Sequence, residues 1–218
     1  MKKSLVFLLT IALSLPLFPQ NEAAGPSMLE GFAETPWGTS FEGVRERFIS
    51  MAQNPDSDEQ IAIINEKKDE FILIRRNGIF YHYRFYKTPE EVVKSRPKTE
   101  EMAPSEHEGQ GALFSVGVIF SYIKAKMIQE KLEAKYGKPL KESLDDKKIA
   151  GARLWELATT NQEPPKGGFI LQWQENYQQA PFTRRIDYFG AELQNIIKKE
   201  YRLYYDAREL KILKDMVN

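Results

Sequence analysis

The sequence predicts an α+β protein in which an antiparallel sheet carries amphipathic helices on one side. Short segments of alternating apolar residues, separated by turn residues, indicate antiparallel strands. Apolar residues recur at helical spacing in two further segments, each followed by such strands. One helix plus three strands is therefore expected twice, in half-units spanning about 37–87 and 112–190. No residue-level repeat accompanies this order, so duplication and coincidence both stay open.

The first 24 residues indicate a secretory signal peptide. Lys2 and Lys3 precede an apolar run, and the small residues Ala23 and Ala24 follow it. The alternative is an uncleaved anchor, although the run is short for a comfortable membrane span. We therefore expect an exported protein of the periplasm or outer cell envelope, attached to the membrane only if this segment is kept.

The composition restricts the classes of function. The chain has 218 residues, a formal net charge of +0 and 42% hydrophobic residues, which supports one core in a single domain over 25–218. The balanced charge gives no general attraction to nucleic acid or to an anionic membrane. The absence of cysteine excludes disulfides, thiolate metal sites, a cysteine nucleophile and a lipid-modified cysteine.

The first half-unit begins with a helix and continues with three strands. Thr39 and Glu42 have the spacing of a capping box, and Trp37 just before them is expected to be a core anchor. The helix presents one apolar face made of Phe41, Val44 and Phe48. The strands are expected in 60–65, 70–76 and 79–87.

The last two of these strands form the best-defined hairpin, because Asn77-Gly78 is a strong two-residue turn signal. Such a turn pairs Arg76 with Ile79 and separates the side chains into two faces. One face is apolar, with Ile72, Ile74, Tyr81, Tyr83 and Phe85. The other face mixes aromatic residues with arginine and histidine, with Phe71, Leu73, Arg75, Phe80, His82, Arg84 and Tyr86.

A long polar connection over 88–111 separates the half-units, and we expect one or two helical turns followed by a mobile loop. Residues 112–120 then predict a strand whose alternate large residues face the core, namely Phe114, Val116, Val118 and Phe120. Ser121 is the expected N-cap of the second helix. Gly137 and Pro139 end that helix.

A charged connector over 141–151 precedes strands expected in 152–158, 168–174 and 182–189. One long C-terminal helix is expected over 191–217, with an apolar stripe that Glu200 interrupts. At 1.5 Å per residue this helix would be about 40 Å long, enough to project or to meet a second copy. A homodimer through Leu203 and Leu210 is therefore one hypothesis.

Two motifs carry a resemblance to known proteins: Pro36-Trp37-Gly38-Thr39-Ser40 at a helix start, and Lys135-Tyr136-Gly137-Lys138-Pro139 at a helix end. They resemble segments of small exported bacterial α/β proteins of unknown function. The layout over 37–189 is similar to the helix-plus-sheet modules of the beta-lactamase-inhibitor-protein-like group and of outer-membrane assembly lipoproteins of the BamE type. The resemblance implies an envelope protein that binds a partner. The missing lipidation cysteine departs from the lipoproteins.

The best candidate binding surface comprises Phe80, His82, Arg84 and Tyr86, because exposed aromatic and arginine side chains are frequent binding anchors. The alternative is that another part of the chain covers this face. No catalytic, cofactor-binding or metal-binding residues are assigned, and no cofactor is expected. The two histidines, His82 and His107, lie in different segments and lack the convergent ligands of a zinc site.

These observations favour a non-enzymatic binding or assembly module that contacts another envelope protein or a small ligand, and not nucleic acid. One rival hypothesis is a hydrolase, which requires His82 or His107 near a carboxylate and a hydroxyl in one pocket. The other rival is a structural protein that dimerises through its C-terminal helix.

Overall fold

The computed structural model describes residues 28–53, 61–95, 109–159 and 164–202. The expected signal segment, His107, and the part of the expected C-terminal helix that carries Leu203 and Leu210 lie outside these residues. Within the described part, none of the helices combines the length and apolar character needed to cross a membrane.

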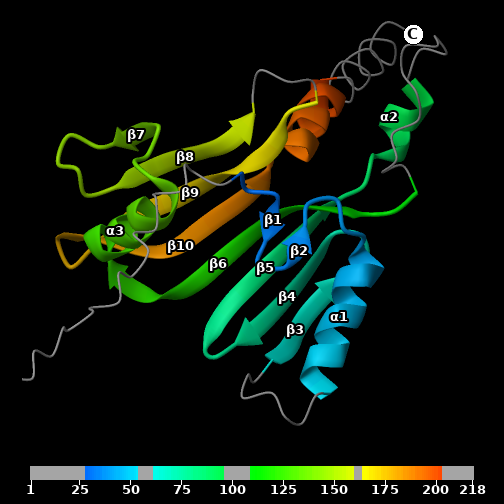
Figure 1. The fold of residues 1–218 in the computed structure, drawn as a ribbon, viewed down its shortest axis with the longest axis horizontal. Helices are drawn as coiled ribbons and strands as arrows, with labels where there is room; N and C mark the ends of the chain where they lie inside the picture. The colour runs from blue at the N-terminus through cyan, green and yellow to red at the C-terminus, as the bar shows by residue number, and fades with distance from the viewer. Residues whose placement is uncertain (1–27, 54–60, 96–108, 160–163, 203–218) are drawn as a thin grey trace, which may run out of the picture.

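Eight strands form one antiparallel sheet in the order β3-β4-β5-β6-β10-β9-β8-β7 (Figure 1). The bounds are β3 Ile61–Lys67, β4 Phe71–Arg76, β5 Ile79–Tyr86, β6 Ala112–Lys124, β7 Lys141–Leu144, β8 Gly151–Thr159, β9 Lys166–Tyr177 and β10 Ala180–Gly190. Each half of the sheet is a meander of neighbouring strands, and the β6–β10 pair joins the halves. The prediction of a mixed fold with antiparallel strands is confirmed.

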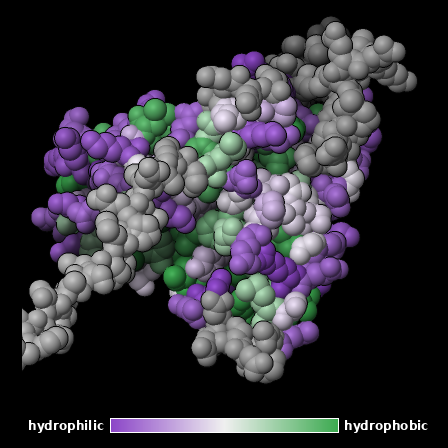
Figure 2. All heavy atoms as spheres, viewed as in Figure 1, coloured by the Kyte–Doolittle hydropathy of each residue, from purple (hydrophilic) through white to green (hydrophobic). Residues whose placement is uncertain are grey.

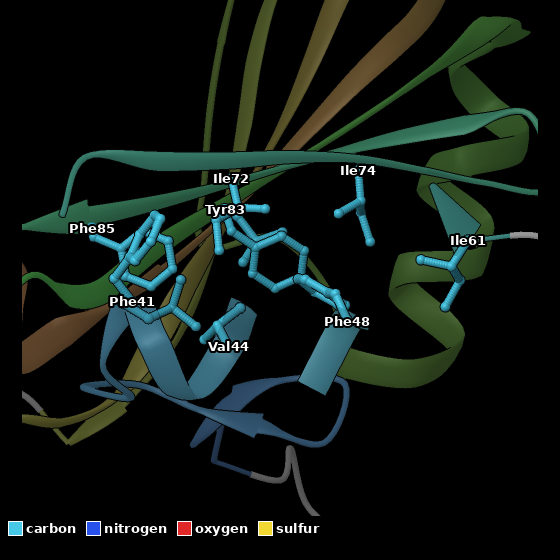
Figure 3. Packing of buried hydrophobic residues seen from close by; sticks show 10 residues of the cluster. Phe41, Val44, Phe48, Ile61, Ile72, Ile74, Tyr83 and Phe85 are labelled. Atoms are coloured by element: carbon cyan, nitrogen blue, oxygen red, sulfur yellow. The ribbon is translucent and has the colours of Figure 1, made fainter. Parts of the chain in front are cut away.

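Helix α1 (Phe41–Gln53) supplies the apolar core of the first half, as its sequence pattern predicts. Its three buried residues meet side chains of β3 to β6 in one cluster, and Figure 3 shows them facing the strands. The members of this cluster, which we call the first core, are Phe41, Val44, Phe48, Ile61, Ile72, Ile74, Tyr83, Phe85, Leu113 and Val116. The predicted cap is wrong by one residue, because Ser40 Oγ, not Thr39, accepts the Gly43 N–H at 3.2 Å.

The β4–β5 hairpin has the register that the sequence predicts. Arg76 pairs with Ile79, and Ile72 pairs with Tyr83. Asn77 and Gly78 both have positive φ, 50° and 78°, as a type I′ turn requires. The apolar side chains of the hairpin therefore enter the first core, and the aromatic–arginine side chains point the other way.

Helix α3 (Ala125–Tyr136) packs against the second half of the sheet, in a second core. The buried members of the second core are Leu29, Leu132, Trp155, Leu157, Ile170 and Ile186. Gly137 ends α3 with φ 80°, as predicted. The expected N-cap at Ser121 is wrong, because β6 continues to Lys124 and no side chain caps the helix.

Two further predictions about the strands are corrected. The connector expected over 141–151 contains β7, which pairs with β8 and forms one edge of the sheet. On β6, Leu113 and not Phe114 enters the first core. The reason is a shift of register between Arg84 and Phe85, where β5 pairs with β6. Such a bulge reverses which residues of a strand point to each face.

The strand register places both cores on the same face of the sheet, which we call the helix face. Tyr83 lies opposite Val116, Val116 opposite Tyr188, and Tyr188 opposite Ile170 across four neighbouring strands. The short hairpin of β1 (Gly31–Phe32) and β2 (Thr35–Pro36) lies on this face between the two helices (Figure 1). The space-filling view shows hydrophobic residues between α1 and α3 and hydrophilic ones over much of the outer surface (Figure 2).

The chain continues after β10 as a helix, described over residues 191–202. Glu200, which interrupts the apolar stripe in the sequence, is buried. Its carboxylate accepts hydrogen bonds from the Tyr86 hydroxyl at 2.7 Å and from the Thr88 hydroxyl at 3.3 Å. These bonds attach the helix to the end of β5, next to the short helix α2 (Glu90–Ser95).

Candidate binding surface on the sheet

The second face of the sheet, which we call the open face, carries the candidate surface. Alternate residues of β4, β5, β6, β10 and β9 form three rows across it. The rows are Arg75–Phe80–Ile119–Arg185–Trp173, Leu73–His82–Gly117–Asp187–Leu171 and Phe71–Arg84–Ser115–Phe189–Phe169. Phe80 and Trp173 keep 36% and 39% of their surface exposed. The open face therefore combines exposed aromatic side chains with a charged centre.

Asp187 is the centre of this face and is almost fully buried. Its Oδ2 accepts hydrogen bonds from Trp173 Nε1 at 2.6 Å and from Arg185 Nε at 2.9 Å. Its Oδ1 accepts a hydrogen bond from Arg185 Nη2 at 3.0 Å. A buried carboxylate needs such partners, because an unpaired buried charge is strongly destabilising. Asp187 thus holds Trp173 and Arg185 in fixed orientations.

Arg84 brings a second guanidinium to the same carboxylate. Its Nη2 lies 3.9 Å from Asp187 Oδ1 and donates a 2.7 Å hydrogen bond to Ser115 Oγ. Its guanidinium also lies over the rings of Phe114 and Phe189, at 5.6 and 5.8 Å from their centroids. Burial lowers the pKa of Arg84, and Asp187 opposes this by stabilising the charged form. Two arginines therefore share one acidic partner.

His82 lies on the open face two residues before Arg84 on β5, and its ring contacts the one aromatic side chain of the neighbouring strand β4. Its ring meets Phe71 edge-on, with ring centroids 5.3 Å apart. Burial lowers the pKa of His82 below 6.5, and the positive charges of Arg84 and Arg185 lower it further, while Asp187 acts in the opposite direction. The imidazole is therefore neutral at pH 7, and the charged centre has two positive groups and one negative group.

Gly117 provides the space in which this arrangement forms. It lies between His82 on one side and Asp187 on the other. A Cβ atom at this position would lie only 2.9 Å from Asp187 Oδ1. The carboxylate occupies the volume that any other side chain would take, so a larger residue would push Asp187 away from its partners.

A second aromatic group lies at the far ends of β6, β9 and β10. The rings of Tyr122 and Tyr177 are stacked, with centroids 4.1 Å apart and an angle of 8° between them. Phe182 meets Tyr177 edge-on, and the Arg184 guanidinium lies 5.2 Å from the centroid of Tyr122. This group repeats the combination of aromatic rings with arginine.

The structure brings together most of the residues that the sequence indicated. Phe80, His82 and Arg84 share the open face, but Tyr86 is buried against Glu200 at the end of β5. Sequence reasoning missed Asp187, Arg185 and Trp173. The run Arg184-Arg185-Ile186-Asp187 does indicate that Arg185 and Asp187 share a face, because residues two apart in a strand point to the same side.

Around His82, the described residues do not assemble the site that the hydrolase hypothesis requires, and its other candidate, His107, lies outside them. Ser115, whose hydroxyl accepts a hydrogen bond from Arg84, is completely buried and therefore inaccessible to a substrate. Within the described ranges, His82 makes no hydrogen bond to a carboxylate or a hydroxyl. The same part of the chain contains no group of three or more histidine, aspartate or glutamate residues placed to hold a metal ion.

Comparison of the chain with models of protein families, with curated proteins and with solved structures gives no match in any of the three. The resemblance to the beta-lactamase-inhibitor-protein-like group and to BamE-type lipoproteins therefore stays a prediction.

Proposed function

We propose that this protein is an exported, non-enzymatic binding module of the cell envelope that holds a protein partner against the open face of its sheet. One observation carries the proposal: Phe80 and Trp173 stay more than a third exposed beside a charged centre that contains Arg84 and Arg185. Tryptophan and arginine are the residues most enriched among energetic hot spots of protein interfaces. Asp187 already fixes two of these side chains, so little of their conformational freedom is lost on binding.

The proposed body of the module is two half-units, each a helix followed by at least three antiparallel strands, with both helices on the helix face. The sheet order supports this plan, because it places the strands of each half on their own side of the β6–β10 pair. An internal duplication would explain the order. Export is proposed from the lysines and the apolar run at the start of the sequence.

Site-specific photo-crosslinking tests the binding proposal. A photoreactive amino acid at position 80 or 173 should form crosslinks to a partner protein in cell envelopes. The control position is 127, where Met127 is exposed on α3 and belongs to neither core. Crosslinks at all three positions alike, or at none, would contradict an open-face binding site. A crosslink to a second copy of the chain would replace the partner with a homodimer.

Cell fractionation tests the export proposal independently. A C-terminally tagged full-length chain should appear in the envelope or periplasmic fraction, and replacing Lys2 and Lys3 by glutamate should reduce export. A tagged chain that stays entirely in the cytoplasmic fraction would contradict it.

A further inference from the structure

We propose that Arg84 and Arg185 form a carboxylate-binding site at the centre of the open face, and that the partner inserts there an acidic side chain flanked by apolar residues. This inference rests on the proposed function and specifies the chemistry of the partner. It follows from three features of the centre: its charge, its unused hydrogen-bond donors and its aromatic surroundings.

The charge of the centre is positive. Arg84 and Arg185 both approach Asp187 Oδ1, at 3.9 and 3.0 Å, and His82 beside them is neutral at pH 7. One carboxylate cannot neutralise two guanidinium groups, so one positive charge stays uncompensated. A partner with one acidic side chain at this position would balance the site.

The two arginines also keep unused donors. Each guanidinium has five N–H groups. Within the described residues, Arg185 directs its Nε and Nη2 to Asp187, while Arg84 donates only from Nη2, to Ser115. The side chains are 30% and 41% exposed, whereas Arg84 Nε is buried and has no hydrogen-bond partner among the described residues, so the donors left for a ligand are Nη groups. The two oxygens of one carboxylate can accept from the Nη groups of both arginines.

The site is built rigidly, which favours specific recognition over loose attraction. Asp187 is buried, holds Arg185 through two hydrogen-bonded atoms and is fixed in turn by Trp173. Gly117 leaves space for this carboxylate. Asp187 is therefore a positioning residue, and the arginines are the groups that contact the partner.

The surroundings favour an acidic peptide over a free anion. Phe80 and Trp173 belong to the row beside the charged centre and keep exposed apolar surface. A peptide can cover these rings with apolar side chains while its carboxylate reaches the arginines, whereas a small anion leaves the rings in water.

The test uses purified protein and three short acetylated and amidated peptides. The first has aspartate between two phenylalanines, the second has asparagine in place of aspartate, and the third has phosphoserine. Binding is followed through the arginine Nε–H signals in two-dimensional NMR. We expect the aspartate peptide to shift the Arg84 and Arg185 signals and to bind at least about tenfold more tightly than the asparagine peptide, because it adds a charged hydrogen-bonded pair.

The variants Arg84→Gln and Arg185→Gln should each remove that preference. The matched control is Arg47→Gln, because Arg47 lies on α1, bonded to Glu34, away from the open face. Equal binding of the aspartate and asparagine peptides, or an unchanged preference in both site variants, would overturn the proposal. Tighter binding of the phosphoserine peptide would assign the site to phosphate and overturn it as well.

The outcome separates this inference from the proposed function. If none of the peptides binds but position 80 still crosslinks to a partner, the carboxylate site is wrong and the binding module stands. If the aspartate peptide binds but no partner crosslinks in cells, the site exists and the assignment of a protein partner is wrong.

Discussion

Trp155 and Trp173 lie on neighbouring strands of one sheet and point to opposite faces. Trp155 is 1% exposed and donates to the Gly137 carbonyl at 2.8 Å, which ties β8 to the end of α3. Trp173 is 39% exposed and donates to Asp187. The same residue type thus closes a core on the helix face and orients a charged group on the open face. Strand alternation therefore separates the residues that form the core from those that would contact the proposed partner.

The largest loss of stability is expected for a substitution on the helix face. Trp155→Ala should lower the free energy of unfolding by about 3–5 kcal/mol, because it leaves a large cavity in the second core and an unpaired Gly137 carbonyl. Trp173→Ala should lower the free energy of unfolding by only about 1–2 kcal/mol, because it removes a partly exposed ring and one hydrogen bond to Asp187, and it should weaken binding of the proposed partner. Chemical denaturation of both variants measures the difference, and equal losses would mean that the open face also forms a core.

A second pair of residues with opposite orientations lies within one strand, β4. Ile72 is completely buried in the first core, while its neighbour Leu73 lies half-buried on the open face. Ile72→Ala should cost about 2–5 kcal/mol. Leu73→Ala should cost less than half as much, because its side chain already contacts solvent. Thermal unfolding followed by circular dichroism compares the stabilities of the two variants. A larger loss for Leu73→Ala than for Ile72→Ala would contradict the assignment of faces.

A smaller loss is expected for the charged centre itself. Asp187→Asn should lower the free energy of unfolding by about 2 kcal/mol, since hydrogen bonds to a charged group are weakened and two guanidinium groups lose their shared anion. Gly117→Ala should act in the same direction by displacing the carboxylate. Arg184→Gln is a control outside the Asp187 contacts. An Asp187→Asn variant with the same free energy of unfolding as the original protein would show that the contacts of Asp187 with the two arginines do not stabilise the fold.

The smallest expected effect is the pH dependence from His82. Its lowered pKa means that the unfolded chain binds a proton first as the pH falls below 6.5. The folded state therefore loses stability between about pH 6.5 and the lower folded pKa, and His82→Gln should remove that part of the loss. Arg84, Arg185 and Asp187 are the charged groups that act on this imidazole. A variant with an unchanged pH profile between pH 7 and 5 would contradict the lowered pKa.

Much of the first half could be predicted from the sequence because its pairing is local. The Asn77-Gly78 turn fixes the register of β4 and β5, and the register decides which residues share a face. This register also predicts that aromatic, arginine and histidine side chains lie together on one side of the hairpin. Phe80, His82 and Arg84 could therefore be grouped before their strands were placed in a sheet.

The rest of the site could not be predicted because it depends on a distant pairing. Asp187 and Arg185 join Arg84 only through β6, and the β6–β10 register shifts between Thr183 and Arg185. Neither the partner strand nor the bulge has a local sequence signal. The predicted N-cap at Ser121 is wrong for a related reason, since pairing with β10 extends β6 to Lys124 beyond the expected helix start.

The β6–β10 pair also has a consequence for the kinetics of folding. Apart from β5–β6, whose strands are separated by α2, every other pairing in the sheet joins strands that follow one another directly. The pairing of Ile119 with Arg185 instead closes a long loop that contains β7, β8 and β9. Bringing distant segments together is slow relative to closing a hairpin. The two meanders are thus expected to gain protection from hydrogen exchange first, and the junction between them last. The charged centre straddles that junction and would be completed only in the final step.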